Sequence, residues 1–125
     1  GVQTCALPIL GVSAGSMNAA HIVYAAPEEP GEAADPHYSR WMNGLGLTET
    51  RILPHYQFIR DHVLDGQKVE DIALADSKKR HFLALPDGSY ILCADGSEAL
   101  YGRGWYFADG MMEEINEDED VLPLR

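Results

Sequence analysis

Ser13 carries the clearest chemical signature in the sequence. It is the centre of Gly11-Val12-Ser13-Ala14-Gly15, which fits the G-x-S-x-G pattern of a nucleophile elbow. In such an elbow a sharp turn between a strand and a helix exposes the serine, and the strained backbone requires small neighbours. The alternative is a Gly-rich helix start that Ser13 merely caps. The apolar stretch before the pentapeptide and the Ala-rich stretch after it favour a nucleophilic serine.

An elbow of this kind also stabilises negative charge. The helix that follows it directs the positive end of its dipole at the serine. We therefore expect the Ala14 backbone N–H to be one donor to the oxyanion that forms when Ser13 attacks a carbonyl. The chemistry that these residues predict is nucleophilic acyl transfer.

The charge of the chain excludes several classes of partner. Its 20 Asp and Glu residues outnumber 9 Lys and Arg, for a formal net charge of -11. Such a surface repels phosphate backbones and anionic lipids, so we expect neither a nucleic acid nor a membrane as partner. Cys5 and Cys93 make no disulfide framework, and no Cys/His cluster has metal-ligand spacing, so neither a metal nor a cofactor is expected. Without a secretory signal or an apolar run of membrane-spanning length, the expected location is the cytoplasm.

The elements that must position Ser13 are expected in an α/β arrangement. Residues 14–25 are rich in Ala and Met and contain no Pro, and they predict a helix. The other expectations for this part are a loop over 27–36, a turn that leads into a short strand over 41–47, an apolar run over 52–56, and two short helices over 57–75 separated at Asp65-Gly66.

The second part of the chain has the pattern of a β-meander. Its short apolar or aromatic runs predict strands over 81–85, 90–94, 99–101 and 105–108, with a final edge strand over 111–115. Asp87-Gly88, Asp95-Gly96 and Asp109-Gly110 lie between these runs and predict hairpin turns. The 125 residues make one domain at most.

Two enzyme classes that use such an elbow fit the rest of the chain poorly. An α/β-hydrolase needs the chain order Ser, acid, His. Here the last histidine is His81, and the expected meander occupies the place of the histidine loop. Patatin-like lipases share an elbow similar to GVSAGSMNAA but use a Ser–Asp dyad whose Asp precedes Gly. All three Asp-Gly pairs of the second part are expected at hairpin turns, so a lipid acyl hydrolase is the less favoured alternative.

A third class resembles nearly the whole chain from Gly11 onward. The matching segments, in order, are GVSAGSMN from Gly11, LGLT from Leu45, ILPHY from Ile52, LPDGSYIL from Leu85 and LYG from Leu100. Together they resemble the peptidase E and cyanophycinase family. The resemblance implies a fold similar to class I glutamine amidotransferases, with a mostly parallel sheet flanked by helices. The amidotransferases themselves carry Cys at the elbow and Glu two residues after the catalytic His, where this chain has Ser13 and Gln57.

The resemblance implies a role for each of four residues. Ser13 is the nucleophile and His55, in the PHY segment, is its base; the alternative for His55 is a buried structural histidine. Asp87, in LPDGS, matches the position of the acid, which is more often Glu in the family. Glu28 matches another acidic position of the family and is the alternative acid. Asp87 is the favoured acid, and the alternative for it is a plain turn residue.

Other polar residues carry weaker expectations. Asn18, one turn beyond the nucleophile, and Tyr56, beside the base, are candidate substrate-binding residues, and each could instead serve packing. The remaining histidines lie in no motif and are expected at the surface or satisfied in the core: His21, His37, His62 and His81.

We therefore expect a cofactor-independent serine hydrolase, dipeptidase-like, that cleaves a small peptide or amide through an acyl-enzyme on Ser13. The chain lacks the Asp-Gln before His55 and the Arg-rich stretch after it that are associated with cyanophycinases, which favours the peptidase E side. Aspartyl specificity, which the resemblance implies for peptidase E, does not follow from these residues. The alternative is a non-catalytic or inactive amidotransferase-like domain. The oligomeric state stays open, a homo-oligomer included.

The first residues stand apart from this assignment. Residues 1–9 resemble a translated sequencing adapter, and Pro8 would remove a backbone donor from an expected central strand. We treat residues 1–9 as unreliable and the chain as the C-terminal half of one peptidase E-like domain whose N-terminal strands are missing. On this basis the chain alone is expected to be unstable or inactive.

Overall fold

The computed structural model describes residues 9–118 and 120–124 as three short helices and eleven strands. The helices are α1 (Ala14–Met17), α2 (Tyr56–Ile59) and α3 (Val69–Asp76). The strands are β1 (Ile22–Tyr24), β2 (Trp41–Asn43), β3 (Ile52–Leu53), β4 (Val63–Leu64), β5 (Gln67–Lys68), β6 (Phe82–Ala84), β7 (Tyr90–Ala94), β8 (Ser97–Tyr101), β9 (Gly104–Ala108), β10 (Met111–Ile115) and β11 (Val121–Pro123). No helix among these residues is long and apolar enough to cross a bilayer.

A four-stranded sheet in the order β10-β9-β6-β3 lies at the centre. Its side chains alternate between the two faces of the sheet, as the period of two in a strand requires. On one face Phe82, Trp105 and Phe107 pack with Tyr24 and Tyr56. On the other face Leu83 belongs to a second apolar cluster. The sheet therefore has one fully packed face and a second that is partly covered, since Tyr106, the neighbour of Leu83 on that face, is exposed.

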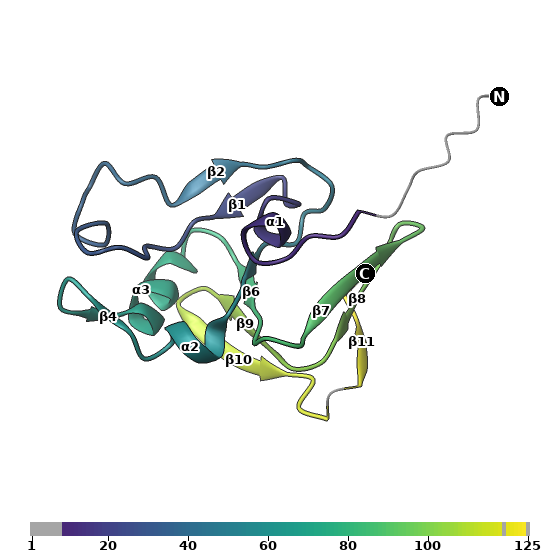
Figure 1. Cartoon of the computed structure of the whole chain (residues 1–125). Coiled ribbons are helices and arrows are strands. Elements are labelled where there is room, and N and C mark those ends of the chain that lie inside the picture. Colours follow the sequence, from purple (N-terminus) through teal and green to yellow (C-terminus); the bar gives the residue numbers. More distant parts are fainter. Residues whose placement is uncertain (1–8, 119, 125) are drawn as a thin grey trace.

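A three-stranded antiparallel sheet in the order β11-β8-β7 covers the second face (Figure 1). Its inward side chains, Ile91, Leu100 and Leu122, pack against Leu83 and Leu85. The chain passes from the outer sheet into the central sheet between β8 and β9, where Gly102 has a φ of 96° that an L-residue would adopt only with strain. The strands after residue 89 thus belong to two sheets.

The first face is covered by helices and by the β1–β2 pair (Figure 1). The strands β1 and β2 pair antiparallel and are joined by the long loop 25–40. A buried network fastens this pair to α3: the Tyr24 hydroxyl donates to Asp76 at 2.6 Å, and Arg40 forms an ion pair with the same carboxylate at 2.6 Å.

Most expected strands are confirmed, and their bounds agree within a few residues. The strands expected over 81–85, 90–94, 99–101, 105–108 and 111–115 correspond to β6 to β10, and β10 lies at a sheet edge as expected. Two short helices, α2 and α3, fall in residues 56–76. Asp65-Gly66 lies between them as the turn of a small β4–β5 hairpin, which the sequence analysis did not predict.

Three expectations about the architecture are wrong. The helix expected over 14–25 ends at Met17, because Ile22, Val23 and Tyr24 pair with β2 instead. The sheet is not mostly parallel: among the described strands, only β3 and β6 pair parallel. The C-terminal part is not a simple meander, because Asp87-Gly88 joins two sheets rather than the two strands of a hairpin.

The predicted α/β class is confirmed: the described residues form mixed sheets and few helices. The amidotransferase-like architecture stays a prediction. The expectation about residues 1–9 falls mainly on residues 1–8, which lie outside the described residues.

Candidate active site

The backbone at Ser13 has the conformation of a nucleophile elbow. Its φ of 53° and ψ of -122° are rare for a residue with a side chain. The Gly15 N–H donates to the Val12 carbonyl at 3.0 Å, so the turn is tight, and α1 follows at once. A Cβ on Gly11 would lie 2.8 Å from the Gly15 carbonyl oxygen, whereas a Cβ on Gly15 would meet nothing within 4 Å. Of the two glycines in the pattern, only Gly11 is sterically required.

The parallel pairing of β3 with β6 brings His55 and Asp87 together. Ile52 lies beside Leu83 and Leu53 beside Ala84 in the β3–β6 register. Because the carboxyl ends of parallel strands meet at the same edge of a sheet, the residues that follow β3 and β6 are neighbours. His55 follows β3 with a left-handed φ of 59°, and Asp87 follows β6.

Two hydrogen bonds connect the three side chains. His55 Nδ1 lies 2.5 Å from Asp87 Oδ1, and His55 Nε2 lies 3.0 Å from Ser13 Oγ. Because a carboxylate only accepts, Nδ1 carries the proton of a neutral imidazole and Nε2 is left to accept from the Ser13 hydroxyl. This is the tautomer that a base for Ser13 needs. The His55 and Asp87 side chains are 44% and 50% exposed, so a ligand can reach the group.

The Asp87 turn is held on two sides. The Asp87 backbone N–H donates to Gln57 Oε1 at 3.0 Å, and Gln57 lies in the first turn of α2, two residues after His55. On the other side the Ser89 hydroxyl donates to the Arg103 carbonyl at 2.6 Å. The segment 55–57 therefore forms two hydrogen bonds with Asp87: His55 contacts the Asp87 side chain, and Gln57 accepts from the Asp87 backbone N–H.

A pocket of about 400 Å³ opens beside Ser13 and His55. Its polar lining residues are Ser13, His55, Glu28 and His62; most of the others are apolar, among them Met17, Leu53, Ile59, Leu64 and Val69. This is the size and character of a small-molecule site. His62, for which a surface or core position was expected, lines the wall, and Glu28 lines it too without a hydrogen bond to His55 among the described residues.

The loop that carries Glu28 is fastened to the β4–β5 turn. Asp65 accepts hydrogen bonds from the backbone N–H groups of Gly31, at 2.8 Å, and Ala34, at 3.0 Å. The Glu28 N–H donates to the Glu32 carboxylate at 3.2 Å. Although the loop contains three prolines and no regular structure, these bonds define where Glu28 lies.

The other expected site residues lie as follows. The Ala14 backbone N–H donates to no acceptor among the described residues, as an oxyanion donor requires. Asn18 is exposed, ends α1, and does not line the pocket.

Tyr56 is fully buried and its hydroxyl donates to Glu70. Burial, with the Glu70 hydrogen bond, raises the pKa of the Tyr56 hydroxyl. Tyr56 is therefore part of the core.

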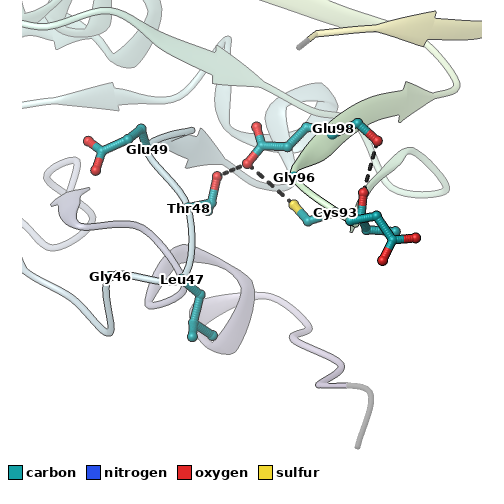
Figure 2. A pocket seen from close by; sticks show the side chains of 10 residues that line it. Gly46, Leu47, Thr48, Glu49, Cys93, Gly96 and Glu98 are labelled. Atoms are coloured by element: carbon teal, nitrogen blue, oxygen red, sulfur yellow. Dashed lines mark hydrogen bonds between the residues drawn. The ribbon is translucent and has the colours of Figure 1, made fainter. Parts of the chain in front are cut away.

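A second hollow, of about 360 Å³, lies between the 46–49 loop and the β7–β8 turn. Figure 2 shows the Thr48 hydroxyl and the Cys93 thiol pointing at one oxygen of Glu98, and the Thr50 hydroxyl donates to the other at 2.5 Å. Glu98 is only 7% exposed, so these donors serve to satisfy a buried charge. No described group of three or more His, Cys, Asp or Glu residues could hold a metal ion, here or elsewhere.

The family model of peptidase family S51 matches residues 2–100. The chain belongs to this peptidase family. The resemblance to peptidase E and cyanophycinase is thereby confirmed, since these are the proteins of the S51 family. No curated protein and no solved structure matches the chain. The S51 match covers the elbow, His55 and Asp87.

Two residues of the site were missed in the sequence. Gln57 was noted only because it differs from the Glu of the amidotransferases, and Asp65 only as a helix breaker. Their hydrogen-bond partners lie at least 30 residues away in the chain, so no local sequence pattern predicts these contacts. Proximity to the PHY segment was the only signal for Gln57.

Proposed function

We propose that this S51 chain is a serine hydrolase of the peptidase E type that cleaves a small peptide or amide. Ser13 is the nucleophile, His55 the general base and Asp87 the acid that orients His55. The observation that carries the proposal is the pair of hydrogen bonds from His55, 3.0 Å to Ser13 and 2.5 Å to Asp87. Membership of a peptidase family supports it independently.

The chemistry follows from these contacts. His55 Nε2 accepts the hydroxyl proton while Ser13 Oγ forms a bond to the carbonyl carbon of the substrate. His55 then donates this proton to the leaving amine as the C–N bond breaks, which leaves an ester on Ser13. His55 next takes a proton from water, whose oxygen attacks the ester carbonyl. As the bond to Ser13 Oγ breaks and the acid is released, His55 returns this proton to Ser13 Oγ. Asp87 stabilises the imidazolium at both stages through Nδ1–H.

The Ala14 N–H is the proposed donor to the oxyanion. Ser13 has a positive φ, which turns the peptide after it so that the start of α1 follows directly. A donor fixed before the reaction stabilises the developing charge without reorganisation. Asn18 is given no substrate contact in this proposal, because it does not line the pocket.

Labelling with a fluorophosphonate, which reacts with activated serines, tests the proposal on the full-length protein. We expect labelling of the wild type, none of Ser13→Ala, and a rate about 10²- to 10⁴-fold lower for His55→Ala and Asp87→Ala. His37→Ala is the matched control, since His37 is exposed and outside the pocket. A folded wild type that is not labelled would overturn the proposal.

The same experiment separates the alternatives. A non-catalytic or inactive domain is not labelled in any form. A lipid acyl hydrolase with a Ser–Asp dyad would be labelled but would not depend on His55, and the 3.0 Å contact from His55 to Ser13 argues against it.

A further inference from the structure

We propose that the pocket beside Ser13 selects ligands that carry a positive charge next to an apolar body, and that Glu28 recognises this charge. The inference deepens the proposed function, on which it rests for the nature of the substrate. It concerns the preference of the pocket for a charged ligand, which dissociation constants measure without any catalysis.

The charges that line the pocket have one sign. Its titratable lining residues are Glu28, His55 and His62, and among the described residues no Lys or Arg lines it. His55 is engaged with Asp87 and Ser13. Among the described lining residues, Glu28 carries the one carboxylate, and no lining Lys or Arg can pair with it.

The Glu28 carboxylate is available to a ligand. It forms no ion pair with any described residue, and Arg60, which follows the lining residue Ile59, is paired with Glu70 at 3.5 Å. The Glu32 carboxylate accepts the Glu28 backbone N–H at 3.2 Å and so adds negative charge to the same loop, outside the pocket lining. Negative charge on one loop raises the local preference for a cation.

The loop holds Glu28 in place before a ligand arrives. Asp65 fixes Gly31 and Ala34 by two hydrogen bonds, and Pro27 and Pro30 flank Glu28 on either side. Loop order that exists before binding does not have to be created by the ligand, so more of the contact contributes to affinity.

The same charge disfavours an anionic ligand. An aspartyl side chain in this pocket would face Glu28 and no lining Lys or Arg. Like charges at close range oppose binding. The structure therefore points away from the aspartyl specificity that the resemblance to peptidase E implies and toward a neutral or basic residue with an aliphatic stem against Leu53, Ile59 and Val69.

Two chemical groups could supply the charge: the free α-ammonium of a peptide or a basic side chain. Four small amides distinguish them. Leucinamide carries only the α-ammonium, Nα-acetyllysinamide only a side-chain ammonium, Nα-acetylleucinamide no charge, and the α-amide of N-acetylaspartate a negative charge.

The experiment measures the dissociation constants of these amides by calorimetry on the full-length Ser13→Ala protein, which cannot hydrolyse them. We expect at least one cationic amide to bind about 3- to 10-fold more tightly than Nα-acetylleucinamide, and the aspartate amide to bind most weakly. Whichever cationic amide shows the preference identifies the source of the charge. Equal binding of all four amides, or tightest binding of the aspartate amide, would overturn the proposal.

Two substitutions assign the effect to Glu28. Glu28→Gln should abolish the preference for the cationic amide, and Glu28→Lys should reverse it, so that the aspartate amide binds most tightly. Because Glu28 is exposed, both variants are expected to fold, and near-ultraviolet circular dichroism checks this. A preference that survives both changes would rule Glu28 out.

The labelling and binding experiments distinguish a failure of the proposed function from a failure of the charge preference. A wild type that is not labelled by the fluorophosphonate, yet binds cationic amides through Glu28, would be a binding domain with the pocket described here. A labelled wild type without the charge preference would be a hydrolase whose specificity comes from elsewhere.

Discussion

The chain contains four Asp-Gly pairs, and the aspartate of one of them lies at the candidate active site. Asp65, Asp95 and Asp109 have φ values of 52°, 52° and 55°, as two-residue hairpin turns require. Asp87 has no such positive φ, and only its glycine does. Its turn therefore does not fold back into a hairpin but passes from one sheet to another beside His55.

This difference bears on what the residues alone can predict. The elbow and the PHY segment are local patterns, and they identified Ser13 and His55 before any geometry was known. Asp87 was found by position in a family motif, although its dipeptide predicts an ordinary turn. The support from Gln57 could not be predicted, because it links residues that are 30 apart in the chain.

We expect Gln57 to act as a positioning residue for Asp87. Gln57→Ala should lower kcat about 10-fold with little change in KM, because the Asp87 turn loses its anchor while the pocket is intact. Gln57→Glu keeps an acceptor for the Asp87 N–H and should retain more activity. The decisive measurement is a double-mutant cycle: with Asp87 already replaced by Ala, Gln57→Ala should cost nothing further. Additive effects would show that Gln57 acts independently of Asp87.

At the scale of elements, the elbow depends on a close approach between the segment before Ser13 and α1. Gly11→Ala would put a methyl group within 2.9 Å of the Ser16 Cα and the Gly15 carbonyl carbon, which are backbone atoms that cannot give way without moving the turn. We expect fluorophosphonate labelling to fall at least 10-fold, since a displacement of about 1 Å costs about 10²-fold.

Gly15→Ala is the matched control for this test. It adds the same methyl group to the same motif, but in open space and within a helix, where Ala is favoured over Gly by about 1 kcal/mol. Labelling should be retained. Equal loss in the two variants would mean that the second glycine is required for a reason other than space.

Sequence patterns predicted the helices and strands correctly where neighbouring residues alone decide the structure. Short apolar or aromatic runs and Asp-Gly turns predicted β6 to β10. The helix expected after Ser13 failed because Ile22, Val23 and Tyr24 find a partner strand in residues 41–43, and pairing at that distance overrides a weak helical preference. The mostly parallel sheet was inferred from resemblance, and the described strands pair mainly antiparallel.

At the scale of the whole molecule, two tyrosine hydroxyls resist ionisation: Tyr24 in the core and Tyr38 in the loop between β1 and β2. Burial, with the nearby Asp76 carboxylate, raises the pKa of Tyr24, and burial raises the pKa of Tyr38 to about 12. In the unfolded chain tyrosine ionises with a pKa of about 10. Above that pH the unfolded state releases protons that the native state retains, so the free energy of unfolding should fall.

Urea unfolding between pH 8 and pH 11 measures this fall. The contribution of the protonated Tyr24 and Tyr38 hydroxyls to the free energy of unfolding is complete below about pH 10. It is lost as the pH rises toward the pKa values of these tyrosines in the folded state. Tyr24→Phe should be less stable at pH 8 by about 1 to 3 kcal/mol, because Asp76 loses a donor, and should show a shallower alkaline decline. A decline as steep as that of the wild type would mean that Tyr24 ionises normally.

The β3–β6 ladder has a consequence for how S51 sequences of this kind can vary in length. Both the proposed base and the proposed acid stand just beyond the ends of two short strands held in one register. The loops that lead into β3 and β6 can gain or lose residues, because the register downstream is unaffected. A single residue inserted between Leu53 and His55, or between Ala84 and Asp87, would displace one partner by about 3.3 Å along its strand and separate the pair. Insertions and deletions should therefore accumulate before these strands during evolution and be absent from the few residues that follow them.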